Sequence, residues 1–181
     1  MISGIILAGG KGTRINSRKA NKVIFVFCGK PMIVYGVELL MGICNPIVLV
    51  VGAYSESVKN VLKNYKLLYI HQRKRLGTGH AVKIGFTGLK NFFNVRINSR
   101  NNPPASARNE SESALNSHLV LVGYGDHMMF YKKKTIQALI NLHKNQKAAV
   151  SLISTVYKNP DKLAWGRIIR DKKGNIRDII E

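Results

Sequence analysis

Acidic residues are scarce in this sequence. The 181 residues include 9 Asp and Glu against 29 Lys and Arg, a formal net charge of +20. The basic residues are spread along the chain, and the clusters at 73–75 and 132–134 lack the interleaved aromatic residues that stack on nucleic-acid bases. This pattern favours a solvated basic surface, and we expect no specific nucleic-acid partner. Any carboxylate directly after a buried strand stands out in such a chain.

The sequence also has few cysteines, no long apolar run and no signal-peptide pattern. Cys28 and Cys44 form no Cys-x-x-Cys pair, so we expect buried reduced thiols and no disulfide framework. No apolar stretch approaches the ~18 residues that span a bilayer. The run at 5–8 lacks the length and the basic leader of a signal peptide. These absences predict a cytoplasmic protein with no membrane partner, and the 45% hydrophobic content predicts one globular domain.

Apolar runs alternate with helical patterns in the first half of the chain. Runs such as "IVLVV" are apolar on both faces, as expected for strands of a mostly parallel sheet covered by helices on both sides. The order is therefore that of an α/β fold. The expected strands are Ile2–Leu7, Ile47–Val51 and Leu67–His71, and the expected helices are Met32–Ile43, Ser55–Lys63 and Thr78–Phe86.

The pattern breaks at 96–117, which is rich in Asn, Ser, Arg and Pro and predicts a flexible insertion. A strand and turn in "HLVLVGYGDHMMF", a helix over Thr135–Asn145 and a strand in "AAVSLIST" (148–155) follow. Two alternating segments around the turn at 172–175 predict an antiparallel hairpin. Because no covering helix follows the hairpin, we expect 1–181 to be a domain truncated at its C-terminal end.

The stretch "ILAGGKGTRINSRKANKV" raises the question of what its glycines and cations bind. A dinucleotide fingerprint requires a third glycine where Ile15 stands, and a P-loop requires Ser or Thr after Gly-Lys, where Gly12 stands. Neither pattern fits. Closely spaced glycines still allow backbone N–H groups to approach an anion, and Lys11, Arg14 and Lys22 add positive charge. The residues alone leave two alternatives, a polyphosphate site or an ordinary basic turn.

Three segments that follow expected strands decide between these alternatives, because ligands of open α/β sheets bind at the carboxyl ends of strands. They are "AGGKGTR", "HQRKRLGTGHA" and "GYGDH". With "GKPM", "WGRI" and "IRDIIE", their order and spacing resemble the sugar-phosphate nucleotidyltransferases. The resemblance is closest to the N-terminal uridylyltransferase domain of the bifunctional N-acetylglucosamine-1-phosphate uridylyltransferases. It implies a Rossmann-like three-layer domain, with a mostly parallel mixed sheet and an antiparallel C-terminal hairpin.

The resemblance also implies a nucleotide site. The glycine-rich loop and the residues before Asp126 match positions that hold the nucleoside triphosphate, and Gln72 and Gly77-Thr78 match those that read uracil. A side-chain amide carries both a donor and an acceptor, which suits the N3–H and O4 edge of that base. The implied nucleotide-binding residues are Leu7, Ala8, Gly9, Gly10, Lys11, Gly12, Thr13, Gln72, Gly77, Thr78, Tyr124 and Gly125.

The implied reaction is Mg²⁺-dependent transfer of a uridylyl group from UTP to N-acetylglucosamine-1-phosphate. Asp126 matches the carboxylate that holds Mg²⁺, a hard cation that needs one or two protein groups beside the phosphates. Arg14 and Lys22 match the catalytic cations that stabilise the transition state by charge. Gly166 and Glu181 match positions that contact the acetamido sugar.

The sequence departs from the family pattern in several places, among them "HMMF" after Asp126 and the insertion at 96–117. Asn21 replaces the proline before Lys22, and we expect the loss of a fixed φ to leave the lysine rotamer less determined. The family's second metal ligand and its acetyltransferase domain would lie beyond Glu181. Two alternatives therefore stay open. One is a nucleotidyltransferase of other specificity, for molybdenum cofactor, an isoprenoid phosphate or another sugar. The other is an inactive nucleotide- or nucleic-acid-binding remnant.

Overall fold

A computed structural model of the chain describes residues 1–10, 20–74, 76–98, 118–159 and 166–180. The chain divides into two compact units, Met1–Ile136 and Gln137–Glu181. In chain order, the first unit contains β1 (Ile2–Ala8), the short 3₁₀ helix η2 (Lys22–Ile24), β2 (Val26–Phe27), β3 (Lys30–Pro31), α1 (Met32–Met41), β4 (Ile47–Val51), α2 (Ser55–Val61), β5 (Leu68–His71), α3 (Gly77–Asn98), β6 (Leu119–Tyr124), η3 (Met128–Phe130) and the start of α5 (Lys133–Asn145).

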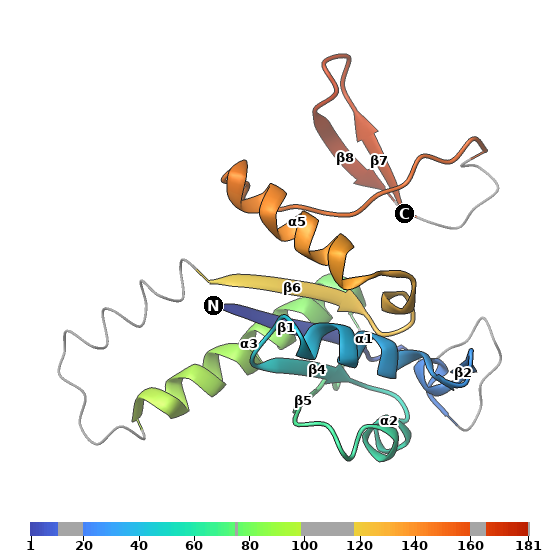
Figure 1. Cartoon of the computed structure of the whole chain (residues 1–181), viewed down its shortest axis with the longest axis vertical. Coiled ribbons are helices and arrows are strands. Elements are labelled where there is room, and N and C mark those ends of the chain that lie inside the picture. Colours follow the sequence, from blue (N-terminus) through green and yellow to red (C-terminus); the bar gives the residue numbers. More distant parts are fainter. Residues whose placement is uncertain (11–19, 75, 99–117, 160–165, 181) are drawn as a thin grey trace. The chain divides into compact units, whose positions relative to one another are not determined.

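The first unit is built on a parallel four-stranded sheet in the order β5-β4-β1-β6, with β1 between β4 and β6 (Figure 1). The chain passes from β1 to β4 and β5 on one side, and returns through α3 to β6 on the other side. The carboxyl ends of β1 and β6 are therefore a topological switch point, where loops diverge and leave room for a ligand.

Alternate residues of the central strand face two separate cores. Ile6 packs in a cluster with side chains of α1 and α2, whereas Ile5 packs in a cluster with side chains of α3. Both side chains are 0% exposed. Burying an isoleucine contributes roughly 1.5–3 kcal/mol, so helices on both faces stabilise the strand. The three-layer α/β expectation is confirmed.

The second unit contains the rest of α5 and the antiparallel pair β7 (Arg167–Arg170) and β8 (Ile176–Ile180). The Asp171 carboxylate accepts backbone hydrogen bonds from Lys173 and Asn175, each at 2.9 Å, and Gly174 has φ +84°. Hydrogen bonds from Asn175 lower the pKa of Asp171. The predicted C-terminal hairpin is confirmed, and it forms a sheet of its own.

Other expectations need correction. The segment 148–155, predicted as a strand, has no strand within the described residues; Val150 is 79% exposed and the segment has no ladder partner there. The helix predicted over Thr78–Phe86 continues to Asn98, so 96–98 of the predicted insertion are helical, and 99–117 lie outside the described residues. Both cysteines are free, but only Cys44 is buried, which raises its pKa to about 12. None of the helices in the described ranges could span a membrane.

Candidate functional site

The carboxyl ends of β1 and β6 lie side by side. Leu7 pairs with Tyr124 in the parallel register, and the N–H of Gly125 donates to the carbonyl oxygen of Leu7 at 3.0 Å. A Cβ added at Gly125 would lie 3.3 Å from that oxygen, so the missing side chain permits the close approach. The structure therefore brings together the first and last predicted segments of the nucleotide site. The described members of this group are Leu7, Ala8, Gly9, Gly10, Tyr124, Gly125 and Asp126.

Gly9 passes through a narrow space after β1. A Cβ at Gly52 would lie 2.6 Å from the carbonyl oxygen of Gly9, and a Cβ at Gly9 would lie 2.8 Å from Oε1 of Gln72. Real Cβ contacts of this length do not occur, so Gly52 must stay a glycine unless the backbone moves. The first turn of the glycine-rich loop is thus fixed by packing against the ends of two neighbouring strands.

Lys22 and Asp126 meet at this edge. The Nζ of Lys22, the first residue of η2, forms an ion pair with Oδ2 of Asp126, two residues after β6. The side chains are 37% and 16% exposed, so both can still reach a ligand. The predicted catalytic lysine and the predicted metal ligand therefore share one site.

The side chain of Asn21 holds η2 in place, a role that was not predicted from the sequence. Its side chain is 0% exposed. Nδ2 donates to the carbonyl oxygens of Ala8 at 2.8 Å and Ala53 at 3.0 Å, and Oδ1 accepts from the N–H of Val23 at 3.2 Å. Its φ of −72° is close to the value that proline imposes. These hydrogen bonds hold the backbone that proline would otherwise restrict, and the expectation that the rotamer of Lys22 is less determined stays a prediction.

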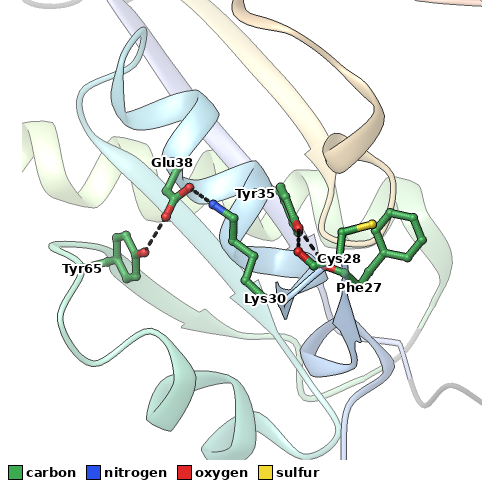
Figure 2. Close-up of polar contacts among 6 residues, drawn as sticks. All are labelled: Phe27, Cys28, Lys30, Tyr35, Glu38 and Tyr65. Atoms are coloured by element: carbon green, nitrogen blue, oxygen red, sulfur yellow. Dashed lines mark hydrogen bonds and ion pairs between the residues drawn. The ribbon is translucent and has the colours of Figure 1, made fainter.

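The segment after η2 is anchored to α1 (Figure 2). The hydroxyl of Tyr35 donates to the carbonyl oxygens of Phe27, the last residue of β2, at 2.7 Å and of Cys28, in the turn before β3, at 2.9 Å. Figure 2 also shows Glu38 between Lys30 and Tyr65, which donate to its carboxylate at 2.5 Å and 3.1 Å. The hydrogen bond from Lys30 lowers the pKa of Glu38. Both flanks of η2 are therefore held.

Gln72 lies after β5 and is 5% exposed. Its Nε2 donates to the carbonyl oxygen of Gly77 at 3.2 Å and lies 3.1 Å from Nδ1 of His80. The Gly77 carbonyl can only accept, so it fixes which end of the amide carries the donors. Gly77 has φ +86° and opens α3, with Thr78 next. The structure thus groups the predicted uracil-reading residues and adds His80, whose role had no signal in the sequence beyond its place in "GTGHA".

The two ends of the Gln72 amide have different surroundings. Both hydrogens of Nε2 are directed to Gly77 and His80, whereas Oε1 faces Gly9. The expectation from sequence gave the amide both a donor and an acceptor for the base. In the folded chain the donor end of the amide is directed at Gly77 and His80.

Comparisons with known proteins identify the family of the domain. The family model described as "MobA-like NTP transferase domain" matches residues 4–172. The chain belongs to this family. It is 34% identical over 177 residues to the bifunctional protein GlmU of Pseudothermotoga lettingae and 35% identical over 182 residues to that of Acetivibrio thermocellus. The matches cover 98% and 99% of this chain and 33% of each relative, so the chain spans about a third of their length.

A solved structure shows the same fold. A protein of Bacillus anthracis described as a glucose-1-phosphate thymidylyltransferase superposes with a TM-score of 0.68 at 20% identity, covering 100% of this chain and 64% of that chain. This likeness concerns the fold, while the family model identifies an NTP transferase domain. The resemblance found in the sequence is confirmed.

The remaining predicted residues of this NTP transferase domain belong to the second unit or fall outside the described residues. Gly166 directly precedes β7 in the second unit. The loop residues Lys11, Gly12, Thr13 and Arg14, and the terminal Glu181, lie outside the described residues. Their assignments stay predictions.

Proposed function

We propose that the chain transfers a uridylyl group from UTP to N-acetylglucosamine-1-phosphate. The observation that carries the proposal is the pairing of Lys22 with Asp126 at the switch point of an NTP transferase domain. Two relatives about a third identical to the chain are bifunctional GlmU proteins, and the "LGTGHA" segment points to a uracil nucleotide.

In this reaction, an oxygen of the acceptor's 1-phosphate forms a bond to the α-phosphorus of UTP. The bond from that phosphorus to the oxygen bridging toward the β-phosphorus breaks, and pyrophosphate leaves. The backbone from Leu7 to Gly10, which is the described part of the loop, holds the triphosphate. Lys22 would place its ammonium group beside the α-phosphate, where negative charge develops, and Arg14 would add a second cation. No protein nucleophile is needed.

Asp126 is the residue that would hold Mg²⁺. Among the described residues, no group of three or more His, Cys, Asp or Glu side chains could hold a metal. One partly exposed carboxylate beside a phosphate site suits Mg²⁺, which keeps waters and takes its other ligands from the substrate. The bound ion would neutralise charge on the phosphate oxygens. In the structure Lys22 forms an ion pair with the Asp126 carboxylate, and this pairing compensates the negative charge of Asp126 before the substrate binds.

Gln72 supplies base selection in this proposal. Uracil presents an N3–H donor, which matches the Oε1 acceptor that faces Gly9. The N3 of cytosine is an acceptor and would face that oxygen unfavourably. Because unpaired polar groups at a buried site cost about 1–3 kcal/mol, UTP should be favoured over CTP by roughly tenfold or more.

The test is pyrophosphate release with purified protein, N-acetylglucosamine-1-phosphate and Mg²⁺, comparing UTP with CTP, ATP, GTP and dTTP. Mass spectrometry then identifies the nucleotide sugar. Glucose-1-phosphate and other phosphorylated acceptors test the sugar. The Asp126→Asn variant, prepared identically, corrects for contaminating enzymes. Preference for another nucleotide or another acceptor would indicate a transferase of other specificity, and no product with any pair would indicate an inactive remnant.

A further inference from the structure

We propose that Asn21 is the positioning residue of Lys22, a role that rests on the proposed function of this site. Asn21 replaces a proline, yet it does more than restrict one backbone angle. Its side-chain amide joins the end of β1, the turn before α2 and the start of η2, and Lys22 is the next residue.

The hydrogen bonds of Asn21 use all the donors of its side chain. The two Nδ2 hydrogens go to the carbonyl oxygens of Ala8 and Ala53, and Oδ1 caps η2 by accepting from the N–H of Val23. The backbone N–H of Asn21 donates to Oγ of Ser57 at 3.3 Å, a bond that proline cannot make. A buried polar group with these partners is costly to disturb, since every lost bond leaves a buried group unpaired.

The consequence concerns the distance between Lys22 and the phosphate loop. Ala8 is the last residue of β1, and the glycines of the loop follow it directly. By bonding to the Ala8 carbonyl, Asn21 sets where η2 begins relative to that loop. The opposite side of the site is fixed separately, by the bond from Gly125 to Leu7. Lys22 is thus aimed across the end of β1 toward Asp126 by a clamp on its preceding residue.

Positioning differs from general stabilisation in what it predicts. A clamp that acts through Lys22 matters for turnover only while Lys22 is present, because the ammonium group is what it places. A residue that only stabilises the fold lowers activity whether or not Lys22 is present. A double-mutant cycle separates the two roles.

The first measurement is this cycle, made with Asn21→Ala, Lys22→Ala and the double variant. We expect Asn21→Ala to lower kcat about tenfold with KM for UTP changed less than about twofold, since transition-state contacts are lost while ground-state binding is kept. The double variant should then match Lys22→Ala alone. Losses that multiply would overturn the positioning role. Asn60→Ala, at an exposed asparagine of α2, is the matched control and should behave as the parent.

The second measurement does not depend on activity. Pulsed acylation with peptide mapping reports how available each lysine amine is, and an ion-paired lysine reacts slowly. We expect Asn21→Ala to speed acylation of Lys22 several-fold. Lys59, which pairs with Glu56 at 2.8 Å, should keep its rate as the internal reference. An unchanged Lys22 rate would overturn the proposal. If Asn21→Ala fails to fold by circular dichroism, Asn21→Ser, which keeps a capping oxygen, replaces it in both measurements.

The two measurements separate failure of this inference from failure of the proposed function. A parent chain without transfer activity would refute the uridylyltransferase proposal, while faster acylation of Lys22 in Asn21→Ala would still establish the clamp. An active parent with unchanged Lys22 acylation would refute the clamp alone.

Discussion

Lys22 reaches across the end of β1 to form an ion pair with Asp126, so one short contact joins the segment after the phosphate loop to the end of β6. The two residues lie more than a hundred positions apart in sequence. Their pairing places a cation and a carboxylate where a metal–nucleotide complex carries charges of both signs. Each of the two can therefore be tested through the other.

We predict that Asp126→Asn raises the Mg²⁺ concentration required for half-maximal activity by about tenfold, because the amide keeps the shape of the carboxylate without its charge. The measurement is pyrophosphate release over a Mg²⁺ titration. Glu56→Gln removes a carboxylate that is paired with Lys59 on α2 and is the matched control. Parental activity of Asp126→Asn at limiting Mg²⁺ would show that Asp126 is not a ligand.

Arg14→Ala is predicted to raise the activation barrier for transfer by ~2 kcal/mol or more, as expected for a cation that meets charge developing on the phosphates. The readout is kcat/KM for UTP. Arg170→Ala is the comparison, because this arginine lies in β7 and donates to the Gly174 carbonyl at 2.7 Å within its own hairpin. Equal kcat/KM for Arg14→Ala and the parent would remove Arg14 from the catalytic residues.

Gln72→Leu is predicted to raise KM for UTP about tenfold with a smaller effect on kcat, because the variant loses the acceptor for the base. It should also reduce the preference for UTP over CTP. His80→Ala provides a second test. Without its Nδ1 acceptor one Nε2 hydrogen of Gln72 is released, so the preference should weaken while Oε1 remains. Unaltered nucleotide preference in both variants would place base selection elsewhere.

Local sequence patterns were enough to predict strands of the central sheet. The apolar run Ile47–Val51 is a strand with the predicted bounds, and the carboxylate of Asp126 follows a strand as expected. The clamp by Asn21 could not be predicted, because its partners Ala8 and Ala53 are adjacent to it only after folding. From the sequence alone, replacing proline by asparagine indicates only the loss of a restrained φ. The hydrogen bonds to these two carbonyl oxygens are known only from the folded structure.

The failed strand at 148–155 has a related cause. Its alternation of apolar residues is compatible with a strand, but a strand also needs a neighbour to pair with. None pairs with it among the described residues, and Leu152 and Ile153 are each 42% exposed. Pairing is a tertiary property that a single segment does not encode.

Gly52→Ala is predicted to destabilise the domain by more than ~1 kcal/mol and to weaken UTP binding, because the new Cβ would meet the carbonyl oxygen of Gly9 at 2.6 Å. Backbone atoms cannot move aside as a flexible side chain does. Gly79→Ala is the matched control, since nothing lies within 4 Å of its added Cβ in α3, and helix propensity favours alanine there. The measurement is the midpoint of urea-induced unfolding for both variants. Equal midpoints would show that the Gly9 turn adjusts freely.

The last prediction uses the carboxylate that anchors α1 to β3. Hydrogen bonds from Lys30 and Tyr65 lower the pKa of Glu38 in the folded chain below its ordinary value of 4.5. The stabilisation from this lowered pKa is therefore present above pH 4.5 and is lost as the pH falls through the folded pKa. Because the pair is partly exposed and screened, we expect a Tm difference of only a few degrees between the parent and Glu38→Gln at pH 7, with the parent higher.

The difference should shrink below about pH 4, where the parent's own carboxyl is protonated and resembles the amide. Tm measured from pH 3 to pH 8 for the parent, Glu38→Gln and the surface control Glu56→Gln tests this. High salt at pH 7 should reduce the difference as well, because screening weakens exposed ion pairs. A Tm difference that persists unchanged at pH 3 would mean that Glu38 stabilises α1 and β3 through packing of its aliphatic part, with no contribution from its charge.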